Sequence, residues 1–481
     1  MARSTPLLAP ARRRRRVAAL AALLTIVATT QASGAIVAAS ADPQVADPRD
    51  SAGPLDLTEA SLEQRDVRMF LRIATAGEWT HADLAATPGR ALCVTLTHGG
   101  PGGGGSICVA SRGRRPALSY TPLAAGTAQQ APRRLAARVT HPAPGVLQAS
   151  FLPVAAGLTV GPYSWSVQST WTDAAACARA CVDRLPGGGD VAAQLGLLGA
   201  PPCFGAAARD LSQPCENPDL QRMVQPAPAR AKILHDPYCD RQTHPGLLST
   251  CAFGAAQEDA AGTFALIGDS HAASLKVPLQ AVTLGRRWRG VSIVRATCPA
   301  TQAARPVLRT RRRARQCMQW NRQVLEWLAD HRAVRTVFLS AYAGAQVGRA
   351  DGKGMFATAR AGYRDEIRRL LRHVRRVVVI RDVPTAAPDH LRCVATALRE
   401  GRATATACTQ ARRRALRPDP LAEAARSMRS ARVRLIDLTE RFCDDRRCYA
   451  VVGGALVHHD RTHMTTPFSA TLGPFILRAL D

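Results

Sequence analysis

Two kinds of hydrophobic pattern divide the chain. In residues 65–172, short runs of alternating apolar and polar residues are separated by glycine and proline. Seven of these runs predict β-strands, at 67–73, 91–96, 106–110, 117–120, 135–139, 146–152 and 163–171. Strands at this spacing predict an N-terminal β-sandwich of immunoglobulin-like type.

From residue 263 onward, strand-like runs alternate with longer helix-like runs. Strands are expected at 263–267, 291–296, 336–340, 377–383 and 434–438, and helices at 272–284, 316–331, 358–373, 421–430 and 467–480. Pro278 should kink the first of these helices or shift its start. The alternation predicts a parallel sheet covered by helices on both faces, which is an α/β/α three-layer domain over residues 263–481.

The remaining segments show no such periodicity. Residues 42–64, rich in proline and alanine in their first part, are predicted to be a linker. Residues 173–262 contain many prolines and six cysteines, and they predict an irregular, cysteine-rich connector.

The N-terminus has the three parts of a secretory signal peptide. Five arginines at 12–16 precede an apolar run at 17–28, and Ala39-Ser40-Ala41 fits a cleavage site. The alternative is an uncleaved anchor, although the polar residues after Ala28 make a poor membrane span. We therefore predict a signal peptide over residues 1–41 and a secreted or extracytoplasmic protein.

The cysteines support export. All fourteen follow the predicted signal, and an even number in an exported protein indicates disulfides. No tight C-x-x-C pair suggests zinc. The sequence leaves the connectivity open. Neighbour pairing gives Cys93–Cys108, Cys177–Cys181, Cys203–Cys215, Cys239–Cys251, Cys298–Cys317, Cys393–Cys408 and Cys443–Cys448.

The charge is strongly positive, because 64 Lys and Arg residues face 36 Asp and Glu residues, a formal net charge of +28. Such a surface favours anionic partners, including acidic wall polymers and membrane surfaces. No nucleic-acid-binding motif accompanies the charge, so we do not expect a nucleic-acid partner.

One short motif could carry chemistry. The predicted strand 263–267 runs into Gly268-Asp269-Ser270-His271, which predicts a tight turn and then a helix. Open α/β sheets bind ligands at the carboxyl ends of their strands, and N–H groups at a helix start can face an oxyanion. The alternative is that Asp269 or Ser270 only caps the helix.

A second motif, Asp460-Arg461-Thr462-His463, lies near the C-terminus. A serine nucleophile needs a base, usually a histidine that a carboxylate orients. An aspartate three residues before a histidine can reach its ring. His459 and His463 also have a metal-binding spacing, but Gly453-Gly454 indicates a loop and H-E-x-x-H is missing, so we expect no metal.

Three features together resemble the SGNH (GDSL-type) hydrolase superfamily, and most closely the extracytoplasmic SGNH-like domain fused to acyltransferase family 3 membrane proteins. They are the stretch 266–271, the pair Cys298-Pro299 after the second strand, and Asp460-x-x-His463. The resemblance covers about residues 239–481. It implies Ser270 as nucleophile, His463 as general base and Asp460 as orienting acid, with no cofactor.

The chain departs from the family pattern in its oxyanion site. Many members have an asparagine after the third strand, but Tyr342-Ala343-Gly344 stands there, and the only asparagines are Asn217 and Asn321. The second-motif glycine has no clear match either. We expect the Ser270 N–H and an unidentified donor to form the site. The Tyr342 hydroxyl is one candidate, with core packing as its alternative, and His271 receives no catalytic role.

The resemblance implies a secreted serine-dependent O-acyl, most simply O-acetyl, transferase or esterase that acts on cell-envelope polysaccharide. A separate membrane protein would then supply the acyl group. The alternative is a non-catalytic glycan-binding envelope protein with an SGNH-like fold, which the missing asparagine favours. The sequence predicts no oligomeric state.

Overall fold

The computed structural model describes residues 44–86, 88–99, 103–112, 115–123, 131–172, 177, 179–232, 239–303, 310–348 and 354–481. All of them belong to one compact unit, Ala35–Asp481. The predicted signal peptide of residues 1–41 lies outside the described residues. Among the described helices, none has both the length and the apolar character that crossing a membrane requires.

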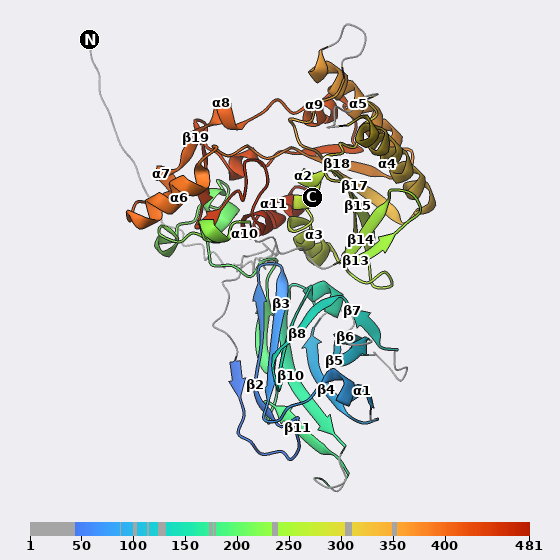
Figure 1. The fold of residues 1–481 in the computed structure, drawn as a ribbon, viewed down its shortest axis with the longest axis vertical. Coiled ribbons are helices and arrows are strands. Elements are labelled where there is room, and N and C mark those ends of the chain that lie inside the picture. The colour runs from blue at the N-terminus through green and yellow to red at the C-terminus, as the bar shows by residue number, and fades with distance from the viewer. Residues whose placement is uncertain are drawn as a thin grey trace, which may run out of the picture. The chain divides into compact units, whose positions relative to one another are not determined.

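The N-terminal region is rich in β-strands and consists of two antiparallel sheets (Figure 1). The first has the order β1 (Gln44–Ala46), β2 (Leu57–Arg65), β3 (Arg68–Thr75), β9 (Val146–Phe151), β8 (Ala137–Ala143). The second has the order β11 (Cys181–Leu185), β10 (Gly161–Trp171), β4 (Ala91–His98), β5 (Gly104–Arg112), β6 (Arg115–Pro122), β7 (Arg133–Leu135), and β12 (Val191–Leu195) also pairs with β10. A short helix, α1 (His81–Ala86), precedes β4.

Apolar side chains of both sheets belong to one core. Leu62 and Leu71 of the first sheet and Trp165 of the second are buried in the same cluster. This burial explains the alternating pattern of the sequence, since every second residue of a strand faces the core. An immunoglobulin-like strand arrangement remains a prediction.

Two segments differ from the sequence-based expectation. The predicted linker, residues 42–64, contains β1 and β2, and β2 buries Leu57, Ala60 and Leu62. The predicted irregular connector, residues 173–262, contributes β11 and β12 to the second sheet. It also contains β13 (Asp240–Thr243) and β14 (Ser249–Gly254). Proline-rich stretches flank these strands, so their alternating apolar pattern was not recognised in the sequence.

The C-terminal sheet has the order β13-β14-β16-β15-β17-β18-β20. Its central strands are parallel: β15 (Gly262–Gly268), β16 (Trp288–Val294), β17 (Val334–Ser340), β18 (Arg376–Ile380) and β20 (Val433–Ile436). The parallel sheet predicted for residues 263–481 is present in these strands, but two strands of the connector extend it: β14 runs antiparallel to β16, and β13 antiparallel to β14. The sheet is therefore mixed, and the connector supplies its antiparallel edge.

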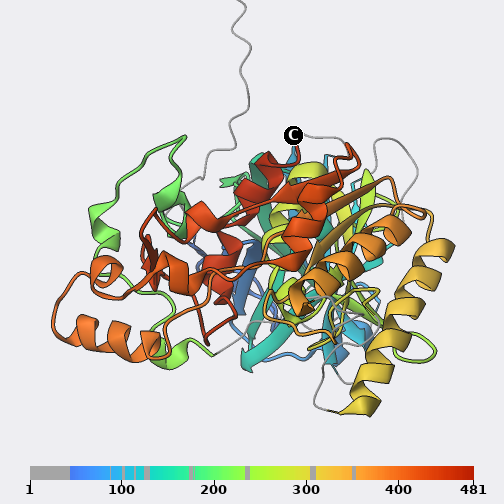
Figure 2. The ribbon, with the colours of Figure 1, turned by 90° about the horizontal axis from the view of Figure 1, so that it is seen from above.

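Helices cover both faces of this sheet (Figure 1 and Figure 2). Leu266, Phe338 and Val378 belong to one apolar cluster, together with residues of α3 (Pro278–Arg286) and α11 (Gly473–Arg478). The next residue of each strand faces the other way, into a cluster with α4 (Arg311–Asp330), α5 (Met355–Leu370) and α9 (Pro420–Ser427). Apolar residues on both faces explain why these strands read as continuous hydrophobic runs.

Prolines divide two of the predicted helices. The expected helix 272–284 is two helices, α2 (Ser270–Ser274) and α3, and Pro278 is the first residue of α3, where its missing N–H breaks no helical bond. The expected helix 467–480 is likewise α10 (Thr466–Ala470) and α11.

Between β18 and α9 the chain makes an excursion with α6 (His390–Arg399), α7 (Thr404–Ala407), β19 (Thr409–Ala411) and α8 (Arg412–Ala415). In this excursion β19 pairs with β21 (Arg447–Tyr449). The pairing joins the excursion to the segment that leads to Asp460. Farther along, β22 (Val451–Val452) pairs with β23 (Ala455–Leu456).

Seven disulfides join all fourteen cysteines, and each cysteine bonds to its neighbour in the sequence. These are the pairs that neighbour pairing gives. Cys298–Cys317 ties the loop after β16 to α4, and Cys393–Cys408 closes the excursion after β18.

Candidate active site

The turn after β15 places Ser270 at the carboxyl edge of the sheet. Gly268 ends β15 beside Val294 of β16 and Ser340 of β17, so the chain leaves these strands at one edge. Gly268 has a φ of +148°, and a Cβ there would lie 2.0 Å from the Ser340 carbonyl oxygen. Only glycine fits this turn.

Asp269 fixes the position of the turn. Its Oδ1 accepts a hydrogen bond of 2.9 Å from His271 N and caps α2, as one sequence alternative expected. Its Oδ2 accepts another of 2.9 Å from Tyr342 N, in the loop after β17. Burial raises the pKa of Asp269, although His271 and both N–H groups oppose this shift. Asp269 thus fastens the Ser270 turn to the neighbouring strand.

Ser270, His463 and Asp460 form a hydrogen-bonded chain. Ser270 Oγ lies 2.9 Å from His463 Nε2, and His463 Nδ1 lies 2.8 Å from Asp460 Oδ2. The serine and the histidine are 193 residues apart in the sequence. The structure therefore brings together the three residues that the two motifs predict, and the hydroxyl can donate its proton to the ring.

Asp460 is held as a carboxylate. Its Oδ1 accepts hydrogen bonds of 2.7 Å from the N–H groups of Thr462 and His463. Burial raises the pKa of Asp460, but these bonds and the His463 ring outweigh it and keep that pKa well below its usual range. A charged carboxylate at Nδ1 keeps the Nδ1 proton in place and leaves Nε2 free to accept the serine proton.

A second Asp–His pair lies beside the first. His271 Nδ1 donates to Asp382 Oδ1 over 2.6 Å, and both side chains are buried. Asp382 also accepts hydrogen bonds from Ala343 N, 2.7 Å, and Val383 N, 2.9 Å. Asp382 N donates to Asp419, the cap of α9. The loops after β15, β17 and β18 are therefore joined through this pair.

The sequence interpretation missed Asp382 and gave His271 no role. Asp382 fell inside the predicted strand 377–383, whereas β18 ends at Ile380. One signal in the sequence could have identified Asp382, namely that it is an acidic residue shortly after a continuous apolar run. Burial lowers the pKa of His271, but its hydrogen bond to Asp382 and the nearby Asp269 charge outweigh this and raise that pKa above its ordinary value.

Two backbone N–H groups after β17 are unavailable as oxyanion donors. Tyr342 N and Ala343 N already donate to Asp269 and Asp382. The Tyr342 ring packs 4.6 Å from the His271 ring, which itself lies 4.7 Å from the His463 ring. Tyr342 is thus close to the triad, and a donor role for its hydroxyl remains a prediction.

The loop after β16 carries backbone strain. Thr297 has a φ of +65°, a left-handed conformation that β-branched residues rarely adopt. It follows β16 at the same edge of the sheet as the Ser270 turn. The amide nitrogen of buried Asn321 donates to Pro299 O and Thr301 O, so this asparagine braces the same loop. Asn217 caps a distant turn.

The alternative of a metal site uses the same residues. Ligand atoms of His459, Asp460 and His463 lie within 4.8 Å of one another. However, His463 directs one ring nitrogen at Ser270 and the other at Asp460. A metal on His463 would have to displace one of these contacts, so the geometry fits a triad better.

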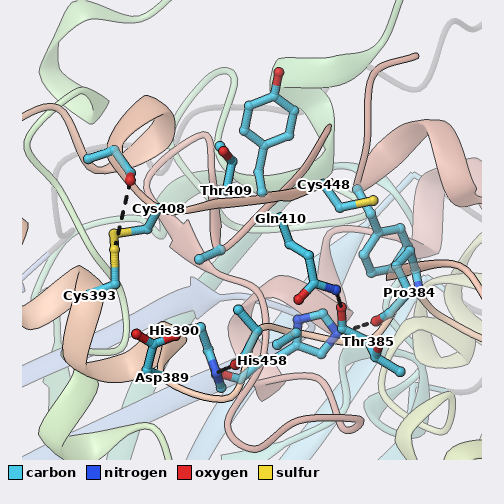
Figure 3. Close-up of a pocket in the computed structure, with 16 residues that line it drawn as sticks. Pro384, Thr385, Asp389, His390, Cys393, Cys408, Thr409, Gln410, Cys448 and His458 are labelled. Carbon is cyan, nitrogen blue, oxygen red and sulfur yellow. Dashed lines mark hydrogen bonds between the residues drawn. A yellow bond between two sulfur atoms is a disulfide. The ribbon is translucent and has the colours of Figure 1, made fainter. Parts of the chain in front are cut away.

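A pocket of about 220 Å³ adjoins the segment that carries Asp460 (Figure 3). The disulfide Cys393–Cys408 and the side chains of Asp389, Thr409 and Gln410 contribute to its lining. His458 lies on its wall and donates to Pro384 O over 2.7 Å. Burial lowers the pKa of His458 to about 3, so this histidine is neutral and structural. The pocket thus offers polar groups next to the loop of Asp460 and His463.

Comparison with known proteins gives one family. A solved structure, the periplasmic domain of a lipopolysaccharide acetyltransferase from Salmonella ser. Paratyphi A, is 15% identical with a TM-score of 0.37, and the match covers 46% of this chain and 85% of that one. No curated protein matches this chain. Residues 238–478, half of the chain, match the family described as "SGNH domain (fused to AT3 domains)". The chain belongs to this SGNH domain family.

Proposed function

We propose that this protein is a serine-dependent O-acyl transferase or esterase that acts on cell-envelope polysaccharide, with acetyl as the simplest acyl group. The observation that carries this proposal is the unbroken contact from Ser270 Oγ through His463 to the ionised Asp460. The family membership supports the same chemistry.

The reaction has two halves. His463 Nε2 takes the proton of Ser270 Oγ as this oxygen attacks the acyl carbonyl carbon, and the same proton then passes to the leaving oxygen. The product is an ester on Ser270. In the second half, His463 deprotonates an incoming hydroxyl, which takes the acyl group, and returns the proton to Ser270. A sugar hydroxyl makes the protein a transferase, and water makes it an esterase.

The setting that we propose is extracytoplasmic. The signal-peptide prediction and the seven disulfides are both typical of exported proteins. The family description names domains fused to AT3 domains, which supports a membrane acyl-donor protein as partner. The steps above need no cofactor.

A second candidate is a glycan-binding envelope protein without catalysis. Two observations favour it: the chain has no asparagine after β17, and the N–H groups of Tyr342 and Ala343 are already occupied. Losing one oxyanion donor costs about 100- to 1,000-fold in rate. A slow enzyme and an inactive fold would therefore look alike in a routine assay.

Intact-mass measurement after exposure to an activated acetyl ester separates the candidates. We expect wild-type protein to gain one acetyl group and Ser270→Ala to gain none at this site. Release of the group into water indicates an esterase, and release to an added glycan indicates a transferase. If wild type and Ser270→Ala acquire the same adducts, the catalytic proposal fails.

A further inference from the structure

The outer face of the sheet β2-β3-β9-β8 carries two rows of polar side chains. Strand register places Ser61, Arg72, Gln148 and Thr140 in one row. The second row contains Glu63, Phe70, Ser150 and Arg138 in the same strand order. With strands about 4.8 Å apart, each row spans about 14 Å. The inner face of these strands is the apolar core, so the polar rows form a separate surface.

This face is the floor of a groove of about 750 Å³, within the size range of ligand-binding clefts. The connector forms part of the wall, with Gly199 and Pro201 among its lining residues. The wall is fixed to the sheet, because Asp66 and Gly199 exchange two backbone hydrogen bonds of 2.8 and 2.7 Å. Gln64 likewise exchanges two hydrogen bonds with Gly196.

One residue departs from the polar pattern of the floor. Phe70 lies on the outer face, where an antiparallel sheet normally presents polar residues to solvent. Its ring is partly exposed, and the Arg65 guanidinium lies 5.2 Å from the ring centre. A flat apolar ring among hydroxyl, amide and guanidinium groups matches a sugar ring, which has a C–H face and a rim of hydroxyls.

The charges of the groove indicate which glycans would bind. The charged lining residues are Arg65, Arg68, Arg72 and Arg138 against Glu63 and Asp66, which is four positive minus two negative, or +2. Ion pairs hold two of these guanidinium groups, Arg72 to Glu59 and Arg65 to Glu63, and counting Glu59 lowers the net charge around the groove to +1. Guanidinium groups recognise carboxylates and phosphates through paired hydrogen bonds.

We propose that this groove binds a segment of an anionic polysaccharide, one that carries carboxylate or phosphate groups along its chain. Val277 and Thr466, which follow α2 and His463 in the sequence, also line the groove. A bound chain would therefore contact the domain that carries Ser270. The proposal deepens the proposed function and rests on it for acyl transfer, whereas binding itself does not require Ser270.

The test measures binding with the Ser270→Ala protein as parent, so that no turnover interferes. The probes are polygalacturonate for carboxylates, polyribitol phosphate for phosphates, and dextran as the neutral polymer. We expect at least one anionic polymer to bind, more weakly at high salt. Phe70→Ala and Arg138→Gln should each weaken binding about tenfold. Phe356→Ala and Arg115→Gln, whose side chains are exposed outside the groove, are the matched controls.

Each outcome decides the proposal. Equal binding by Arg138→Gln and its parent, equal binding of dextran, or no binding of any probe would overturn it. Arg138 is exposed, so its substitution tests the groove even if Phe70→Ala fails to fold. Acetyl-adduct formation from a small ester, measured in wild type and in Phe70→Ala, tests the proposed chemistry at Ser270 separately from binding in the groove. Phe70→Ala should bind the polymer more weakly and still form the adduct. If the Ser270→Ala parent binds no polymer while wild type forms the adduct, the groove proposal alone fails; polymer binding without any adduct in wild type counts against the proposed chemistry alone.

Discussion

Two Asp–His pairs lie at the same sheet edge, and they differ in exposure. The Asp460 and His463 side chains are 43% and 25% exposed, whereas those of Asp382 and His271 are 4% and 5% exposed. The exposed pair lies on a loop and directs its free ring nitrogen at Ser270. The buried pair is held by N–H groups of neighbouring loops. The same two side chains can therefore serve a proton-transfer step in one setting and a rigid frame in the other.

The difference follows from desolvation. A buried ion pair is stable only when further hydrogen bonds compensate for the lost water, and Asp382 receives two from backbone N–H groups. Asp460 receives the same number, from Thr462 and His463 in its own loop. Substitution of Asp382 should therefore disturb several strands, and substitution of Asp460 only one loop.

The largest expected effect is on catalysis by the exposed pair. We predict that Asp460→Asn lowers kcat on an activated acetyl ester about 10⁴-fold, because the amide no longer holds His463 in the productive tautomer. The melting temperature should change little, because the carboxylate is partly exposed. A kcat within tenfold of wild type would show that His463 does not depend on Asp460.

The next effect is on stability and involves the buried pair. We predict that Asp382→Asn lowers the free energy of unfolding by about 3–5 kcal/mol, because an amide has one acceptor oxygen for the three hydrogen bonds that the carboxylate accepts from His271, Ala343 and Val383. Urea denaturation measures this loss. Asp365→Asn, at an exposed position of α5, is the control and should be nearly neutral. If both variants have the same free energy of unfolding, the buried pair does not stabilise this edge of the sheet.

The smallest effect is a pH dependence of stability that we expect from His271 in the buried pair. The raised pKa of His271 means that its contribution to stability is complete below its ordinary value of 6.5 and is lost as pH rises through the raised value. His271→Gln should therefore destabilise the protein more at pH 5.5 than at pH 9. Thermal unfolding of both proteins across this range measures the difference, and an equal loss at all pH values would contradict it.

The sequence predicted the exposed pair and its serine because these residues lie in two short motifs. Asp460 and His463 are one turn apart, and Ser270 follows an obvious buried strand. The buried pair joins residues 111 positions apart, and neither His271 nor Asp382 has a partner nearby in the sequence. Only strand register brings them together, and register is a property of the folded sheet.

The same reasoning explains which parts of the fold were predictable. The strands that bury both faces, such as β15 and β18, stood out as continuous apolar runs. The antiparallel edge did not, because every residue of β13 is exposed and β14 lies among turns and cysteines. The identity of the oxyanion donor is also not predicted, because no motif marks it and the N–H groups of Tyr342 and Ala343 donate to other residues.

The disulfides suggest an order of assembly. No cystine loop encloses or overlaps another, and the widest separation is only 19 residues, between Cys298 and Cys317. As the chain emerges from its N-terminus, each cysteine meets its partner before the next pair has appeared. Oxidation in simple chain order therefore produces the native set, without reshuffling of bonds. The crosslinks are local, and none of them joins the N-terminal sheets to the C-terminal sheet.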